Sequence, residues 1–222
     1  MTNVLYIHGM GGGEDSRIPS ILRSELERMT CHTPQAESVR VVVKTYDFDP
    51  EKAHVQILSW IDELKPALIV GESLGAVHAI RIASVPHILV SPALNAPRAF
   101  ALLAPLTLIP GVTYLLDRIY RPRDGMRQPL HFTYRTLRKY SAHFKAALQN
   151  MPSHGSTDVF FAFFGTRDHY RRSGIVSLRS WKMHFGNTYS IYDGTHFMEE
   201  EFVLSMLLPK ILGMLDVQRA QL

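Results

Sequence analysis

Six short runs of apolar or β-branched residues divide the chain, and most are apolar at consecutive rather than alternate positions. They cover residues 3–8, 39–46, 67–71, 87–91, 158–164 and 187–192. Strands that are apolar on both faces are typical of a parallel sheet covered on both sides by helices. We therefore expect six strands in one mainly parallel sheet.

Segments with apolar residues at helical spacing separate most of these runs. They cover about 19–29, 51–64, 74–84 and 174–183, and a last one covers 198–216. Alternating strands and helices predict an α/β fold with a doubly wound sheet. A chain of 222 residues is long enough to form one such domain, 1–222.

The alternation is interrupted between residues 93 and 151, where no convincing strand occurs. The interruption begins with 18 uncharged residues, 99–116, which would suit a membrane span. Pro105, Pro110 and Gly111 near the middle, and strands on both sides, argue against a span. We expect instead a helical cap, 93–151, inserted after the fourth strand.

Positive charge is concentrated in the same segment. The chain has a net charge of +4, but residues 98–145 hold nine basic and two acidic residues, a net +7 that leaves −3 elsewhere. Charge confined to one insertion does not predict a nucleic-acid-binding face. It leaves open an anionic substrate, peripheral contact of the cap with an anionic membrane, or a solvated helical face.

The composition is that of an ordinary globular protein, with 46% hydrophobic and 20% charged residues. The single cysteine, Cys31, excludes an internal disulfide framework and suits a reducing compartment. The first residues enter a strand directly, without a basic and apolar leader. We expect a cytoplasmic protein with no transmembrane segment.

The pentapeptide Gly71-Glu72-Ser73-Leu74-Gly75 lies between an apolar run and a helical pattern. Glycine is needed on each side of Ser73 where a turn is so sharp that a Cβ at Gly71 or Gly75 would collide with a neighbouring strand or helix. We expect Ser73 at the apex, in a strained backbone conformation with its hydroxyl above the sheet. It is the candidate nucleophile; the plainer alternative is an ordinary turn serine.

A serine hydroxyl reacts well when a base takes its proton and a third group orients that base. Asp168 and His196 follow the last two predicted strands, and parallel strands gather such residues at one edge of the sheet. We therefore expect His196 as the base and Asp168 as the acid. Asp193, three residues from His196, and Asp158, at the start of a strand, are the competing carboxylates.

The developing charge on a substrate carbonyl needs two backbone N–H donors. One is expected from Leu74, which follows the nucleophile, and the other from Met10 in the glycine-rich loop after the first strand. Gly9 lets that loop approach the substrate closely. His8 is expected to brace the loop through backbone hydrogen bonds rather than to act as a base.

These motifs resemble those of the α/β-hydrolase superfamily. His8-Gly9-Met10 matches the oxyanion loop and residues 71–75 the nucleophile elbow; the order Ser73, Asp168, His196 also matches. The chain is similar to compact bacterial esterases of the YqiA-like type, which begin directly at the His-Gly strand. The resemblance covers all but the cap and implies a trimmed sheet of six strands and hydrolysis of esters or related acyl compounds.

The leading hypothesis is a serine hydrolase that cleaves carboxylic esters of a small-molecule acyl substrate. Thioesterase or amidase activity on an anionic acyl substrate is the alternative within the same machinery, and a non-catalytic binding protein of hydrolase fold is the alternative outside it. The sequence has no His-Glu-x-x-His pair, and residues 9–13 fit neither the P-loop nor the dinucleotide pattern. We expect no metal and no cofactor.

Overall fold

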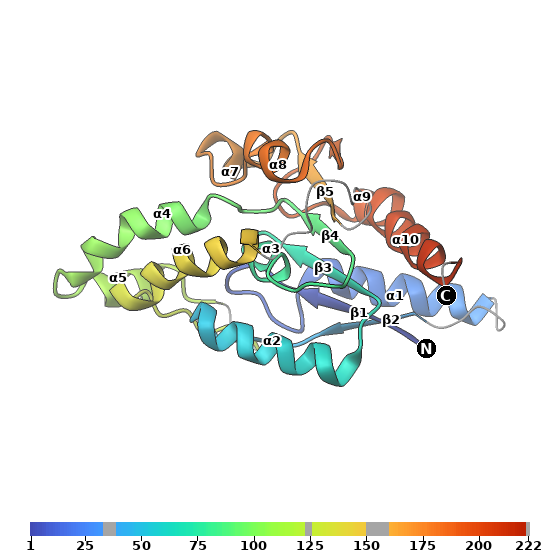
Figure 1. The fold of residues 1–222 in the computed structure, drawn as a ribbon, viewed down its shortest axis with the longest axis horizontal. Coiled ribbons are helices and arrows are strands. Elements are labelled where there is room, and N and C mark those ends of the chain that lie inside the picture. The colour runs from blue at the N-terminus through green and yellow to red at the C-terminus, as the bar shows by residue number, and fades with distance from the viewer. Residues whose placement is uncertain (33–38, 123–125, 150–159, 221–222) are drawn as a thin grey trace.

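The computed structural model describes residues 1–32, 39–122, 126–149 and 160–220 (Figure 1). Six strands form one sheet in the order β2-β1-β3-β4-β5-β6, and every neighbouring pair is parallel. The strands are β1 (Thr2–Ile7), β2 (Val39–Val43), β3 (Leu68–Glu72), β4 (His87–Val90), β5 (Phe160–Gly165) and β6 (Tyr189–Tyr192). The predicted parallel sheet of six strands is confirmed.

Helices connect the strands and cover both faces of the sheet. In chain order they are α1 (Arg17–His32), α2 (Pro50–Leu64), α3 (Gly75–Ala79), α4 (Ala96–Leu103), the 3₁₀ helix η1 (Ala104–Leu108), α5 (Val112–Ile119), α6 (Tyr134–Gln149), α7 (His169–Arg172), α8 (Leu178–Phe185), α9 (Glu200–Phe202), the π-helical η2 (Val203–Leu207) and α10 (Leu208–Ala220). The doubly wound α/β architecture predicted from the alternating pattern is confirmed.

Successive side chains of each inner strand enter different cores. Leu5 and Ile7 of β1 face a core built with α2, α3, α6 and α8, whereas Val4 and Tyr6 face a core built with α1 and α10. All four are at most 1% exposed. Because strand side chains alternate between faces, burial on both sides explains why these strands are apolar at consecutive positions.

Three predicted helices have clearly different bounds in the structure. The one expected over 198–216 is divided into α9, the π-helical η2 and α10, and it extends to Ala220. The helix after the elbow was expected over 74–84, but α3 ends at Ala79, where the chain tightens into i→i−3 hydrogen bonds before Pro86 and β4. The helix expected over 174–183 begins later because Gly174 has a φ of +75° and ends a turn. α8 starts at Leu178, after Ser177 caps it by accepting a hydrogen bond from Ser180 N–H.

The segment 93–122 and 126–149 contains α4, η1, α5 and α6 and no strand among its described residues. α6 packs into the core through Leu137, Tyr140 and Ala147, and the Tyr140 hydroxyl donates a 2.8 Å hydrogen bond to the Phe48 carbonyl. α4 and α5 lie at the end of the molecule toward which the strands run (Figure 1). None of the described helices has the length and hydropathy needed to cross a membrane.

Candidate active site

Ser73 lies at the apex of the turn between β3 and α3, at a φ of +51°, as the predicted strained elbow requires. A Cβ on Gly75 would lie 2.2 Å from the Ile7 carbonyl oxygen, and one on Gly71 would lie 2.9 Å from Ala76 Cα. No side chain fits in either place. Both glycines therefore allow α3 to pack directly against the sheet and hold Ser73 above it.

Ser73, His196 and Asp168 lie in one hydrogen-bonded row. His196 Nε2 is 2.8 Å from Ser73 Oγ, and His196 Nδ1 is 2.8 Å from Asp168 Oδ2. The carboxylate can only accept, so Nδ1 carries the proton and Nε2 is left to accept from the serine hydroxyl. His196 and Asp168 are each 2% exposed, which keeps this arrangement away from bulk water.

Asp168 is fixed by the helix that follows it. It caps α7, with Oδ1 accepting a 2.8 Å hydrogen bond from Tyr170 N–H, while Oδ2 faces His196. Burial alone would raise the pKa of Asp168, but the hydrogen bond and the charge of His196, together with the Tyr170 N–H, hold that pKa below its usual range. The carboxylate is therefore negatively charged where it meets the imidazole.

The competing carboxylates do not meet the imidazole in the part of the chain that the structure describes. The Asp193 side chain is 81% exposed and accepts a 2.7 Å hydrogen bond from the Thr166 hydroxyl, with Arg167 3.4 Å away. It joins the loops after β5 and β6. Asp158 lies outside the described residues.

The loop after β1 lies against the elbow. A Cβ on Gly9 would come within 3.2 Å of Ser73 Cβ. Met10 and Leu74 both line the cavity above Ser73, and neither donates its backbone N–H to a described residue. These two amides are therefore free to bind a substrate oxygen. His8 Nδ1 lies 2.8 Å from the Gly9 carbonyl oxygen, in keeping with the predicted bracing role.

A cavity of about 330 Å³ opens above Ser73. One part of its wall is apolar; the other carries charge. The apolar lining includes Ala93, Ala96, Phe100, Ile175 and Phe197, and the charged lining consists of Arg17, Glu72 and Arg127. Such a cavity suits an acyl chain beside a polar or anionic group.

Two features of the cavity wall were not found from the sequence. Glu72 precedes Ser73 and accepts a 2.8 Å hydrogen bond from the buried Tyr6 hydroxyl; burial raises the pKa of Glu72, although the Tyr6 hydrogen bond opposes the rise. The second is Arg17, which donates to the carbonyls of Phe197 and Met198 beside His196. Glu72 could have been noticed inside the elbow motif, whereas nothing local marks a contact across about 180 residues.

No group of three His, Cys, Asp or Glu side chains within the described ranges is placed to hold a metal ion. The groups that the site does offer are a hydroxyl, an imidazole, a carboxylate and two backbone amides. Together they can attack a carbonyl, move one proton and stabilise a negative oxygen.

No family model and no curated protein matches the chain by sequence. Solved structures do match. A protein from Agrobacterium vitis S4 described as a hydrolase is 15% identical with a TM-score of 0.61, covering 96% of this chain and 88% of its own. A structure of the metagenome-derived lipolytic enzymes LipS and LipT is 12% identical to this chain, with a TM-score of 0.57. The match covers 97% of this chain and 93% of the other.

Est1E from Butyrivibrio proteoclasticus, solved with ferulic acid bound, is 16% identical with a TM-score of 0.52, covering 96% of this chain and 90% of its own. Identities this low carry information about architecture alone. The parallel sheet of six strands, the elbow between β3 and α3 and these similarities together show that the chain has the α/β-hydrolase fold.

Proposed function

We propose that the protein is a serine hydrolase that cleaves carboxylic esters through an acyl-enzyme on Ser73. The observation that carries the proposal is the row of hydrogen bonds from Ser73 Oγ through His196 to Asp168, at 2.8 Å each. The row opens onto a cavity whose lining includes Met10 and Leu74. Geometry of this kind serves nucleophilic attack on a carbonyl carbon.

In the first half of the reaction, Ser73 Oγ bonds to the acyl carbon while His196 Nε2 takes its proton. Asp168 keeps the imidazole in its orientation and stabilises the imidazolium that forms. The N–H groups of Met10 and Leu74 bind the carbonyl oxygen as it becomes negative, and each contributes on the order of 3 kcal/mol to transition-state stabilisation.

In the second half, the imidazolium gives its proton to the leaving alcohol, and the ester C–O bond breaks. A water molecule then attacks the acyl-enzyme while His196 takes a proton from it. Collapse of the second tetrahedral intermediate returns that proton to Ser73 Oγ and releases the carboxylic acid. Apart from the substrate and this water molecule, the reaction uses only groups that the chain itself supplies.

Carboxylic esters are favoured by the lining of the cavity and by the proteins of similar fold. Apolar side chains such as Phe100 and Ile175 offer space for an acyl chain beside Ser73. The structures with which the chain shares its fold include lipolytic enzymes and Est1E. These similarities support a hydrolase, and the apolar lining supports a substrate with an acyl chain.

Thioesters or amides of an anionic acyl compound are the second candidate. Arg17 and Arg127 both line the cavity, and a guanidinium attracts a carboxylate or phosphate. Turnover of acyl-CoA and of simple esters should be compared at low and high salt. Faster acyl-CoA turnover that salt suppresses would favour the second candidate, whereas salt-insensitive preference for simple esters would favour the first.

The direct test combines a fluorophosphonate probe with a series of p-nitrophenyl esters of graded chain length. The wild type should be labelled and should release p-nitrophenol, whereas Ser73→Ala should escape labelling and lose roughly 10⁶-fold in kcat. Ser205→Ala, a matched replacement at an exposed position of η2, should behave as the wild type. Equal labelling of wild type and Ser73→Ala would refute the proposal.

A non-catalytic binding protein of the same fold is the remaining alternative. It would bind an acyl ligand in the cavity without forming a covalent intermediate. Mass spectrometry of the probe-treated wild type distinguishes the two. A mass increase located on the peptide that contains Ser73 supports the hydrolase; no mass increase supports the binding protein.

A further inference from the structure

An unusually apolar surface lies on α4, η1 and α5. Eight large hydrophobic side chains between residues 102 and 120 are 46% to 74% exposed: Leu102, Leu106, Leu108, Ile109, Tyr114, Leu115, Ile119 and Tyr120. We call this set the apolar edge. Monomeric proteins expose single hydrophobic residues everywhere, but a concentration of them marks a surface that meets a partner.

The helix α5 exposes apolar side chains on its outer side. On its inner side, Leu116 packs against the core, the Thr113 hydroxyl donates a 3.0 Å hydrogen bond to the Phe132 carbonyl, and Asp117 accepts a 2.8 Å hydrogen bond from Phe132 N–H. Leu115 and Ile119, one helical turn apart, are 53% and 63% exposed. No residue of α5 is buried. The helix is held by Leu116 and by these hydrogen bonds, and it presents Leu115 and Ile119 outward.

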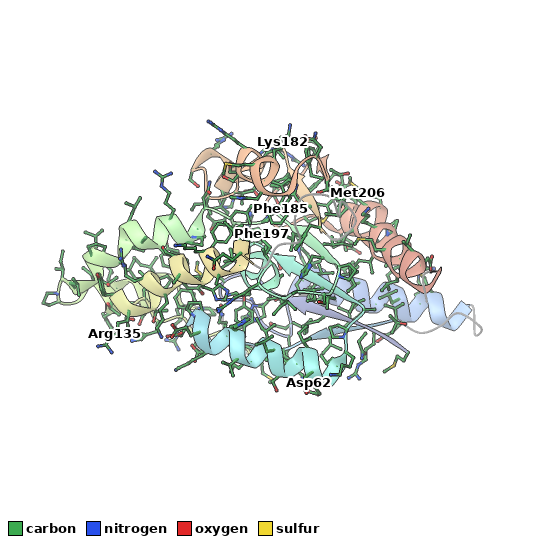
Figure 2. The ribbon with its side chains drawn as sticks, in the orientation of Figure 1. Asp62, Arg135, Lys182, Phe185, Phe197 and Met206 are labelled. Atoms are coloured by element: carbon green, nitrogen blue, oxygen red, sulfur yellow. The ribbon has the colours of Figure 1, made fainter. Side chains whose placement is uncertain are left out.

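Arginines lie next to the apolar edge in the sequence and on the neighbouring helices. Arg98, Arg118, Arg121, Arg135 and Arg138 are exposed, and none of them pairs with a carboxylate of the described residues. Arg135 lies at the end of the molecule formed by α4, α5 and α6 (Figure 2). By contrast, Arg127 and Lys139 are paired with Asp15 and Asp49. The arginines without a carboxylate partner therefore lie at the same end of the molecule as the apolar edge.

We propose that the apolar edge docks the protein onto the surface of a bilayer rich in anionic phospholipid. Apolar side chains enter the boundary between headgroups and acyl chains, tyrosines lie at the headgroup level, and arginines meet the phosphates. Since no described helix can span a membrane, the contact is peripheral.

A second copy of the chain is the competing occupant, and charge argues against it. A symmetric dimer brings the same patch of both subunits together. Arg127 and Lys139 are paired with carboxylates, but five arginines near the edge have no carboxylate partner among the described residues, so a dimer would bring unpaired positive charge together: Arg98, Arg118, Arg121, Arg135 and Arg138. An anionic bilayer attracts the same residues. Each basic residue near the membrane surface contributes about 1 kcal/mol to the free energy of binding.

The apolar edge is connected to the cavity through α4. Ala96 and Phe100, one turn apart on this helix, line the cavity above Ser73, while Leu102 of the same helix is 74% exposed. Docking would bring the cavity wall close to the bilayer. The docking proposal itself does not depend on catalysis, and Ser73→Ala should bind vesicles as well as the wild type does.

The test is flotation of the full-length protein with vesicles of phosphatidylcholine alone or of phosphatidylcholine and phosphatidylglycerol in equal parts. We expect flotation with the anionic vesicles and release at high salt. Leu115→Ser/Ile119→Ser should weaken the partition coefficient by about tenfold or more, and Arg118→Gln/Arg121→Gln by about 30-fold. Both sites are exposed, so the variants should fold.

Matched controls lie on other elements. Val55 and Leu58 on α2 are 69% and 45% exposed, and Val55→Ser/Leu58→Ser should float as the wild type does. Arg179→Gln on α8 is the control for charge. The proposal is overturned if the wild type stays unbound with every vesicle, or if Leu115→Ser/Ile119→Ser floats equally well. Sedimentation velocity showing a stable dimer that Leu115→Ser/Ile119→Ser dissociates would also overturn it.

Discussion

The Tyr6 hydroxyl donates a 2.8 Å hydrogen bond to Glu72, the residue immediately before Ser73. Tyr6 is 1% exposed and Glu72 9%, so the bond joins β1 to the end of β3 inside the protein. A carboxyl group in this place has little access to water. The hydroxyl of Tyr6 therefore satisfies a group whose desolvation would otherwise oppose folding.

Tyr6→Phe keeps the ring and removes this donor. The free energy of unfolding should fall by about 1–3 kcal/mol, because a buried acceptor loses its partner. Urea denaturation followed by circular dichroism measures the change. Tyr114→Phe, at an exposed ring on α5, should leave the free energy of unfolding unchanged; equal stability of Tyr6→Phe and the wild type would contradict the argument.

Asp168→Asn should lower kcat by roughly 10⁴-fold on a p-nitrophenyl ester, because an amide no longer enforces the tautomer in which His196 Nε2 accepts a proton. Asp193→Asn is the matched replacement in the loop that carries His196. Its side chain is 81% exposed, and kcat should stay within about twofold of the wild type since exposed ion pairs contribute little. A larger loss of kcat in Asp193→Asn than in Asp168→Asn would show instead that Asp193 is the carboxylate that orients His196.

Gly75→Ala tests how closely α3 approaches β1. The added Cβ would lie 2.2 Å from the Ile7 carbonyl oxygen and 2.4 Å from that of His8. Backbone atoms must then move, so we expect unfolding to become easier by about 3 kcal/mol or more and fluorophosphonate labelling to be lost.

Gly213→Ala is the control for the same chemical change. A Cβ at this position in α10 meets nothing within 4 Å, and alanine favours a helix interior by about 0.5–1 kcal/mol over glycine. The variant should be slightly stabilised and fully active. Thermal unfolding of both glycine variants, monitored together, distinguishes a crowded position from an open one.

Buried histidines predict loss of stability in acid. Burial lowers the pKa of His8 to about 4 and, with the nearby Arg81 guanidinium, the pKa of His143 to about 3. An unfolded histidine has a pKa near 6.5, so the unfolded chain binds more protons below that value. The free energy of unfolding should fall as the pH decreases from about 6.5 toward 4, with each residue losing on the order of 2 kcal/mol by pH 5.

The variant His143→Gln removes the contribution of His143 to the pH dependence of stability and leaves that of His8. Glutamine does not titrate, and its amide oxygen can still accept the hydrogen bond that Arg81 donates to His143 Nδ1 at 2.7 Å. Urea titrations at several pH values should show a shallower decline for His143→Gln than for the wild type. Identical slopes in both proteins would contradict the role of His143.

The sequence predicted the sheet well because strands depend on local patterns. Consecutive apolar positions marked β3, and glycines at 71 and 75 marked a turn too tight for side chains. The parallel arrangement then placed the ends of β3, β5 and β6 at one edge, which is where Ser73, Asp168 and His196 are found.

Other features depend on contacts between distant segments. Tyr140 of α6 enters the core, and its hydroxyl donates a hydrogen bond to the Phe48 carbonyl 92 residues away. No local pattern in residues 93–151 predicts this contact. α3 ends early, at Ala79, where the hydrogen bonds change to the i→i−3 pattern, and the apolar spacing of residues 74–84 does not predict this change. Arg17 reaches the carbonyls beside His196 only after α1 and the loop before α9 have packed together.

The order of the strands also bears on when the chain becomes competent during synthesis. Ser73 and its strand leave the ribosome early, whereas His196 follows β6, the last strand to be made and the one at the edge of the sheet. A nascent chain, or one truncated before β6, holds the serine without an imidazole to deprotonate it. Under the proposed mechanism, a fragment that ends before β6 should therefore be inert toward acyl esters.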